Sequence, residues 1–322
     1  MDNCIKTIKI KFVDFYEPFD HTNNFVWKFL ENSPKYKPEL SDDPDYVVYS
    51  VFGDKHLDYD CVKIFFTGED QSPDFNLCDY AMGFDHINFK DRYLRLPLYF
   101  LYSEHYKLMS EKHLNDFQKD EFCSFVYSNG RATSVREELF NKVSEYKQVN
   151  SGGRYKNNVG GPVPDKLEFE KKHKFALAVE NVSHDGYTTE KLIQSFAAGC
   201  IPIYYGDPGI LNEFNEEAFI NVRSYETIDQ VIDKIKEIDQ NDELYTKMLR
   251  TPALVNPNAY SDMMASVDEF LDNIFESSKE NAYRRSLECY NKNYVNLQRA
   301  KTKAYRFLSK VKNFPKRLLR RK

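Results

Sequence analysis

A polar loop between two apolar runs carries the residues best suited to bind an anion. Residues 172–206 predict a strand, this loop, a helix and a second strand. Thr188 or Thr189 can cap the helix, whose free amides and dipole attract negative charge. Glu190 suits the first turn, whereas Lys191 is mildly unfavourable there unless an anion lies nearby. A bound diphosphate would supply that anion, and a solvated lysine on an ordinary strand–helix unit is the alternative.

A second candidate is the carboxylate of Glu69. It follows the apolar run 61–68, so it would lie at the carboxyl end of a buried strand, where cleft residues are found. A carboxylate there can accept the proton of a substrate hydroxyl as a new bond forms. The adjacent Asp70 could serve instead, and an ordinary turn carboxylate is the alternative to both.

The third candidate is a glycine-rich basic loop at 151–161. Two diglycines give the backbone freedom, and Arg154 and Lys156 supply charge for a phosphate. A flexible surface loop is the alternative interpretation.

Eight short apolar runs predict the strands that position these residues. They are near-continuous rather than alternating, as in parallel sheets buried on both faces. The runs lie at 8–15, 45–53, 61–68, 80–85, 122–130, 175–181, 201–206 and 219–222. Their tandem alternation with helices predicts an α/β fold of two Rossmann-like domains facing a cleft.

Helical spacing of apolar residues places helices between the strands. They are expected near 25–30, from a capping box of Ser134 and Glu137, before Gly199, and over 228–238. The polar stretch 103–121 is the predicted linker. The expected organisation is a first domain over 1–110, a second over 111–260, and a helical extension with a basic tail over 261–322.

Composition narrows the function classes. The net charge of −5 and the pI of about 5.9 argue against nucleic acid as a partner. Six separated cysteines without a CxxC pair suit free thiols in the cytoplasm. No signal peptide precedes the first predicted strand, no apolar run is long enough to span a bilayer, and the seven histidines lack metal-ligand spacing. P-loop, GxSxG and HExxH patterns are absent from the sequence.

The last 22 residues differ from the rest. Residues 301–322 hold ten Lys or Arg and no Asp or Glu, which leaves the remaining chain with a net charge of −15. Phe307, Leu308, Val311 and Phe314 fall at helical spacing among these cations. Such a segment can lie peripherally on an anionic membrane surface. A solvated helix end is the alternative.

The segment 172–206 closely resembles the donor-binding signature of the α-1,3/1,4-fucosyltransferase family. By this resemblance, Lys191 would hold the diphosphate of GDP-fucose, Glu190 the donor hydroxyls, and Asn181 and Tyr187 the polar rim of the pocket. The matching residues are Glu180, Asn181, Tyr187, Thr189, Glu190, Lys191, Gly199, Pro202 and Gly206.

The resemblance extends to the first domain, most closely to the bacterial branch. Residues 65–85 and 91–99 are similar to its acceptor-side signature, in which Glu69 matches the proposed general base. The family also places a phosphate-binding basic residue, often Arg, in the glycine-rich loop. Ungapped spacing puts Lys156 there, with Arg154 two residues earlier, so the assignment stays open between them.

This resemblance implies a GT-B-like glycosyltransferase that needs no obligatory metal. The expected reaction moves fucose from GDP-fucose, with inversion, to the 3-hydroxyl of GlcNAc in a glycan acceptor; the 1,3 rather than 1,4 linkage rests on resemblance alone. The family's membrane-associated acceptors favour a cytoplasmic protein peripheral to the membrane. The alternatives are a related transferase with another sugar or linkage, and a non-catalytic sugar-binding module.

Overall fold

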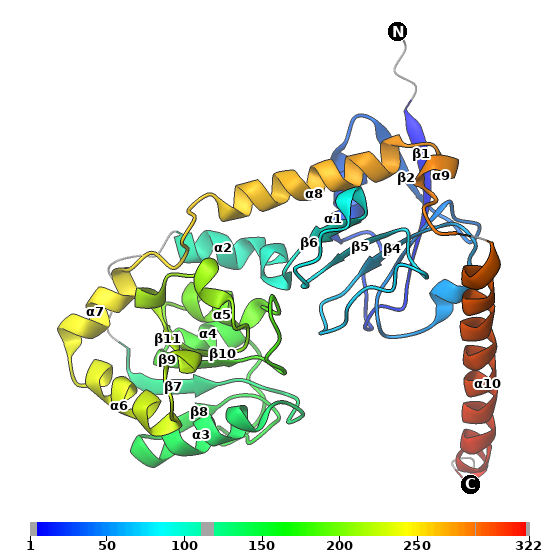
Figure 1. Cartoon of the computed structure of the whole chain (residues 1–322). Coiled ribbons are helices and arrows are strands. Elements are labelled where there is room, and N and C mark those ends of the chain that lie inside the picture. Colours follow the sequence, from blue (N-terminus) through cyan, green and yellow to red (C-terminus); the bar gives the residue numbers. More distant parts are fainter. Residues whose placement is uncertain (1–4, 111–118, 287, 320–322) are drawn as a thin grey trace. The chain divides into compact units, whose positions relative to one another are not determined.

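The computed structural model describes residues 5–110, 119–286 and 288–319 (Figure 1). These residues form two compact units. Unit 1 contains the described residues of 1–83, 87–95 and 266–322, and unit 2 contains those of 84–86 and 96–265.

Unit 1 is built on a six-stranded parallel sheet. Its strand order is β2-β1-β3-β4-β5-β6, and every neighbouring pair is parallel. The central strands are buried along most of their length, as their near-continuous apolar sequences predict. The strands are β1 (Lys6–Val13), β2 (Tyr36–Leu40), β3 (Tyr46–Tyr49), β4 (Val62–Phe66), β5 (Tyr80–Gly83) and β6 (Tyr93–Arg95).

Helices pack on both faces of this sheet. On one face, Phe275 of α8 (Ala259–Glu276) stands edge-on to Tyr46 of β3, with 5.0 Å between ring centroids. The 3-10 helix η1 (Lys55–Asp58) lies on the other, where its His56 stacks on Tyr49. The remaining helices of this unit are α1 (Phe25–Asn32), α9 (Lys279–Ala282) and α10 (Cys289–Leu319), which begins beyond α9 and contacts η1.

Unit 2 holds a five-stranded parallel sheet in the order β11-β10-β9-β7-β8. Its strands are β7 (Glu121–Phe125), β8 (Val149–Ser151), β9 (His173–Val179), β10 (Ile201–Tyr205) and β11 (Ile220–Asn221). Its helices are α2 (Ser103–Ser110), α3 (Ser134–Tyr146), α4 (Lys166–Glu170), α5 (Glu190–Ala197), α6 (Ile228–Asp239) and α7 (Asp242–Arg250).

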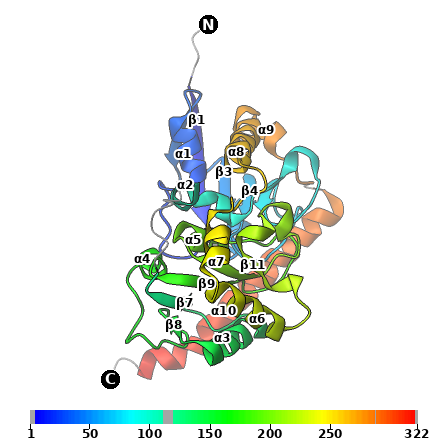
Figure 2. The same cartoon turned by 90° about the vertical axis from the view of Figure 1, so that its left-hand side faces the viewer.

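The helices of unit 2 also cover both sheet faces, as Figure 2 shows for α3 and α6 on one side and α4 and α5 on the other. Phe175, Leu177 and Val179 of β9 join α3, α6 and α7 in one apolar cluster. Ala176 points the opposite way, toward Leu167 of α4 and Ala198 at the end of α5. Two parallel sheets flanked by helices confirm the predicted pair of Rossmann-like folds.

The capping box expected at α3 is wrong. Thr133, not Ser134, is the N-cap residue, and its side chain caps nothing. Ser134 is already helical, and the carboxylate of Glu137 is 2.8 Å from the ammonium of Lys156. The motif fails because the helix begins one residue earlier than expected, so that Arg136 and not Glu137 occupies the third helical position. The predicted helix over 228–238 does carry a capping box, from Thr227 and Gln230.

The stretch 103–121, predicted as a linker, is partly helical. Ser103–Ser110 form α2, which packs against α5 and buries Tyr106 and Met109. Residues 111–118 lie outside the described residues. From Ser266 the chain returns to unit 1, so the two units do not follow the expected boundaries at 110 and 260. Within the described part, no helix is long and apolar enough to cross a membrane.

Candidate functional site

The carboxyl edge of the unit 2 sheet gathers most of the predicted site residues. Because its strands are parallel, the loops that follow β7, β8, β9 and β10 all leave from this edge. The loop after β9 leads into α5, and the glycine-rich loop follows β8. The side chain at the centre of the edge is Lys191, in the first turn of α5.

Lys191 is held by carboxylates. Its Nζ donates to Glu180 Oε2 at 2.9 Å and to Thr189 Oγ1 at 2.7 Å, and it lies 3.5 Å from Glu190 Oε1. Glu180, directly after β9, is fully buried. Burial alone would lower the pKa of Lys191, but Glu180 and Glu190 together raise it above its ordinary value. Lys191 is therefore a fixed positive charge at neutral pH.

The threonines before α5 serve Glu180 and Asp207, and neither caps the helix. Thr189 is the N-cap residue but donates from both its amide and its hydroxyl to Glu180, at 2.8 Å. The hydroxyl of Thr188 donates to Asp207 at 3.2 Å. The predicted cap is wrong because buried carboxylates compete for these hydroxyls.

Glu190 is a carboxylate beside the Lys191 ammonium. Its burial raises its pKa, but Lys191 and then Lys166 of α4 outweigh burial and hold the pKa below the ordinary value. Burial and the nearby Glu190 charge raise the pKa of Tyr102 to about 12. Tyr102 immediately precedes α2, so this neighbour of the carboxylate lies just before the segment predicted as a linker.

Asn181 and Tyr187 differ in their surroundings. The side-chain oxygen of Asn181 accepts a 2.8 Å hydrogen bond from Arg136, whose guanidinium is buried over the ring of Tyr127. Tyr187 is only 1% exposed, and its ring stands edge-on to Phe84, with 4.7 Å between centroids. The structure therefore places Tyr187 in the interior of the loop and Asn181 at its partly exposed start.

Sequence reasoning gave no role to Glu180, Asp207 or Arg136. Asp207 accepts hydrogen bonds from the amides of Gly186 and Gly209, so it fixes the loop from the β10 side. A Cβ added at Gly206 would lie 2.6 Å from Glu180 Cγ, so only glycine lets β10 approach the buried carboxylate. The one sequence signal was the position of Glu180, an acid immediately after a buried strand.

The two basic residues of the glycine-rich loop are engaged differently. Lys156 lies 2.8 Å from Glu137 and donates to Asn141 at 3.1 Å. Arg154 is exposed and has no hydrogen bond or ion pair with any described residue. Since β8 lies two strands from β9, their ends are about 10 Å apart. A long side chain can cross much of that interval.

Glu69 lies in unit 1, at the carboxyl edge of that unit's own sheet. A turn follows β4, in which the buried hydroxyl of Thr67 accepts from the Glu69 amide at 2.9 Å and donates to the Glu69 carbonyl at 3.0 Å. Both Glu69 and Asp70 are exposed. The backbone of this carboxylate is thus anchored while its side chain reaches the surface.

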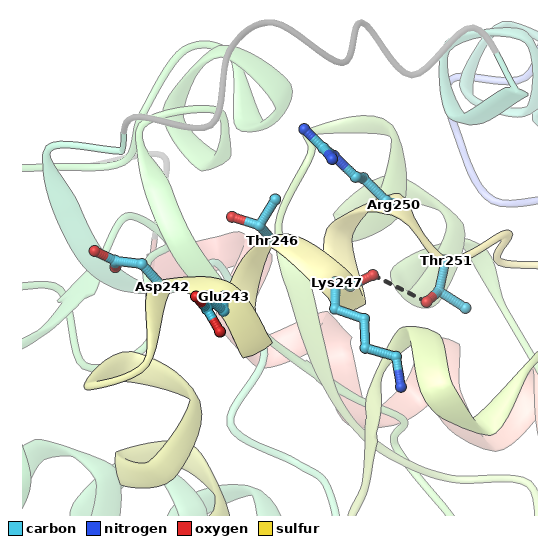
Figure 3. A pocket seen from close by; sticks show the side chains of 6 residues that line it. All are labelled: Asp242, Glu243, Thr246, Lys247, Arg250 and Thr251. Carbon is cyan, nitrogen blue, oxygen red and sulfur yellow. Dashed lines mark hydrogen bonds between the residues drawn. The ribbon is translucent and has the colours of Figure 1, made fainter.

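One surface hollow lies over α7, away from the carboxyl edge. It has a volume of about 710 Å³ and is lined by residues 242–251 of α7 and its end. Figure 3 shows these side chains, with the Thr251 hydroxyl bonded to the Lys247 carbonyl at 3.0 Å. Tyr245 packs α7 against Phe175, near the amino end of β9. This hollow contains none of the predicted site residues.

Across the described residues, no group of three or more His, Cys, Asp or Glu side chains could hold a metal ion.

Two Rossmann-like units, one of which holds a fixed cation at the carboxyl edge of its sheet, are the architecture of the GT-B fold class. Residues 10–102 match the model of the α-(1,3)-fucosyltransferase FucT N-terminal domain. Residues 116–291 match that of the glycosyltransferase family 10 (fucosyltransferase) C-terminal region. The chain belongs to glycosyltransferase family 10.

Individual relatives agree with this assignment. The chain is 36% identical over 258 residues to the α-(1,3)-fucosyltransferase FucT of Helicobacter pylori, a match that covers 67% of this chain and 54% of that protein. It therefore spans about half the length of that relative. A solved α1,3-fucosyltransferase is 28% identical, with a TM-score of 0.72 over 85% of this chain and 92% of the other. A solved structure of an α1,3-fucosyltransferase with GDP-fucose is 26% identical, with a TM-score of 0.70 over 87% of this chain and 94% of the other.

Proposed function

We propose that this protein transfers fucose from GDP-fucose to the 3-hydroxyl of GlcNAc in a glycan, with inversion at the anomeric carbon. The observation that carries the proposal is Lys191, whose side chain is 12% exposed and whose ammonium is fixed by Glu180 and Glu190 at a carboxyl edge. Family membership and the likeness to a structure with GDP-fucose support the choice of donor.

The donor side would stabilise the leaving group. Negative charge develops on GDP as the bond to fucose breaks, and preorganised cations lower the energy of that state. Lys191 and the N-terminus of α5 supply such charge without a metal. Glu190, held ionised by Lys191, would accept hydrogen bonds from the fucose hydroxyls. Asn181 and Tyr187 would complete the pocket, with Tyr187 acting through the loop it anchors.

Arg154 is the better candidate for the second contact to the diphosphate. Lys156 would first have to give up its ion pair with Glu137, whereas Arg154 has no partner among the described residues to lose. Calorimetry with GDP separates the two: Arg154→Ala should weaken binding by about tenfold, and Lys156→Ala by less. A larger loss for Lys156→Ala would reverse the assignment.

Glu69 would act as the general base. The acceptor 3-hydroxyl oxygen forms its bond to C1 of fucose while the bond from C1 to the diphosphate oxygen breaks. The hydroxyl proton passes to the Glu69 carboxylate, and the electron pair leaves with GDP. Attack opposite the leaving group turns β-linked fucose into an α-linked product.

The test is turnover with a panel of GlcNAc-containing oligosaccharides. GDP release that requires both GDP-fucose and an acceptor supports the proposal. Release from another nucleotide sugar alone would favour a related transferase. Tight GDP-fucose binding without turnover on any acceptor would favour a sugar-binding module.

We further propose that the basic tail meets an anionic membrane surface from the cytoplasmic side. Its support is the ten cations and absent acids of 301–322, of which 320–322 lie outside the described residues. Arg306 is already paired with Asp54 and Asp58 of unit 1, so the remaining cations would carry the contact. Deleting 307–322 should abolish co-sedimentation with anionic liposomes at low salt. Unchanged sedimentation would refute it.

A further inference from the structure

A buried lysine in unit 1 has no partner. The side chain of Lys63 in β4 is fully buried, and its Nζ has no hydrogen-bond partner among the residues that the structure describes. Removing an ammonium from water without a counter-charge costs several kcal/mol. Such a group is a signal that something negative is missing beside it.

The side chains around Lys63 add to its positive charge. It shares a sheet face with Cys61 and Phe65, because alternate strand residues point the same way. Burial, and after it the charges of Arg285 and Arg299, lower the pKa of Lys63 to about 8, while Cys61 and Asp60 oppose this shift. Cys61 provides no anion, since burial raises the pKa of its thiol to about 11.

A cavity of about 280 Å³ lies beside the first turns of α10, and it is lined by Arg285 and Arg299, the two guanidinium groups whose charges also act on Lys63. Lys63 itself is not one of the lining residues. Three of its lining side chains are cationic and one is acidic. The lining includes Asp60, Tyr283, Arg285, Asn291, Lys292 and Arg299. The amides at the start of α10 add partial positive charge of the kind that attracts anions.

Two carboxylates in this region, Asp79 and Asp60, are engaged in ion pairs. Asp79 is fully buried, and its two oxygens accept hydrogen bonds from Arg285 Nε, at 3.0 and 3.1 Å, while Oδ1 also accepts from the backbone amides of Arg284 and Arg285. Asp60 is paired with Arg299. Lys63 and Lys292 have no ion pair with any residue that the structure describes, which leaves two positive charges.

We propose that this cavity binds a small phosphate dianion, either free phosphate or the phosphate of a small phosphomonoester. A dianion matches the two uncompensated charges, and guanidinium and ammonium groups are the usual partners of phosphate oxygens. Lys63 is the second residue of β4 whereas Glu69 lies beyond the end of that strand, so the cavity and the proposed general base are at opposite edges of the same sheet. The cavity is therefore a second site, separate from fucose transfer.

The test is phosphate-dependent stabilisation of the whole chain. In phosphate-free buffer, added phosphate should raise the unfolding temperature saturably, because a ligand of the folded state stabilises it by mass action. Sodium chloride at matched ionic strength should not. The rise should persist in Lys191→Ala, which separates this cavity from the donor site. A rise absent from the wild type, or lost in Lys191→Ala, overturns the proposal.

Variants locate the effect. Lys63→Met should raise the unfolding temperature without phosphate and remove the response to it. Lys292→Ala, on the exposed rim, should weaken phosphate binding by about tenfold. If Lys63→Met does not fold, Lys292→Ala alone tests whether phosphate binds in this cavity. Lys301→Ala, the same charge change on α10 outside the cavity lining, is the matched control. A response equal in all three variants overturns the proposal.

A phosphomonoester distinguishes the two sources of the phosphate. Calorimetry is run with inorganic phosphate and, separately, with glucose 1-phosphate, using the wild type and Lys292→Ala. Tighter binding of the ester, lost in the variant, identifies a phosphorylated small molecule as the ligand. Binding of inorganic phosphate alone identifies free phosphate. Failure of both to bind overturns the proposal.

Discussion

Two lysines with little solvent exposure show how differently the two units treat the same charge. Lys191 in unit 2 lies between Glu180 and Glu190, and these carboxylates raise its pKa. Lys63 in unit 1 is at least as buried but faces Arg285 and Arg299, and its pKa falls to about 8. Burial opposes the charge of both lysines, so their partners decide the outcome.

The difference separates a preformed site from an incomplete one. The loop from Glu180 to Lys191 satisfies its own charges, so a diphosphate would add to a cation that is already in place. The cavity beside Lys63 keeps an excess of positive charge that only a ligand can balance. A fixed charge at the donor loop suits catalysis, because it needs no rearrangement as the leaving group develops.

The largest expected effect is on the rate of transfer. We assign the general base to Glu69, which follows the end of β4 opposite to the one where Lys63 lies. Glu69→Gln should keep GDP-fucose binding but lower the transfer rate by about 10²–10⁴-fold, the usual contribution of a general base. Asp70→Asn is the matched control and should retain most of the activity. Near-normal turnover of Glu69→Gln, with a loss in Asp70→Asn, would move the role to Asp70.

Removing the counter-charge of Lys191 should make it resemble Lys63. Glu180→Gln leaves a buried ammonium with half its compensation, and breaking a buried pair in this way typically costs about 3–5 kcal/mol of unfolding free energy. Urea unfolding measures the loss. The double variant with Lys191→Met should recover most of it, since both charges are then gone. A loss in Glu180→Gln below about 1 kcal/mol would show that the pair is not what holds this loop.

The pH dependence of stability should reveal Lys63. Its pKa is about 8 in the folded chain and ordinarily 10.5, so the unfolded chain binds more protons between these values. Stability should therefore rise with pH across that window, by up to about 3 kcal/mol. Arg285, Arg299, Cys61 and Asp60 face this group, and only the difference from Lys63→Met isolates it. Identical pH profiles for the two proteins would contradict the assignment.

Lys191→Ala tests the other lysine through its ligand. Loss of a charge-assisted phosphate contact should weaken GDP binding by about 1.5–3 kcal/mol, measured by calorimetry on protein shown to be folded. Lys172→Ala, an exposed lysine of the same unit, should bind GDP normally. Unchanged affinity in Lys191→Ala would make this residue a structural cation only.

The sequence predicted what local patterns control. Near-continuous apolar runs predicted all the strands except the short β2, β6 and β8, and Gly199 does adopt the left-handed conformation expected after α5, with φ of 68°. The sequence did not show which groups compete for the same hydrogen-bond donors in the folded protein. Nothing local showed that Thr188 and Thr189 would bond to buried carboxylates rather than cap α5.

Packing between residues far apart in the sequence could not be predicted from the sequence either. The polar sequence of 103–121 concealed that α2 buries Tyr106 and Met109 against its unit. The return of the C-terminal helices to unit 1 depends on pairs such as Arg285 with Asp79, which are 206 residues apart. The chemistry of Glu190 and Lys191 was predicted from spacing and resemblance, whereas their counter-charge on Glu180 required the fold.

The central claim is tested most directly by the structure of the product. GDP-fucose and a GlcNAc-containing oligosaccharide are incubated with the full chain, and the purified product is examined by NMR for the site and configuration of the new bond. We predict one fucose, α-linked to O3 of GlcNAc, with one GDP released for each bond formed. A β-linked product, a bond at another oxygen, or GDP-fucose left unconsumed with every acceptor would contradict the account.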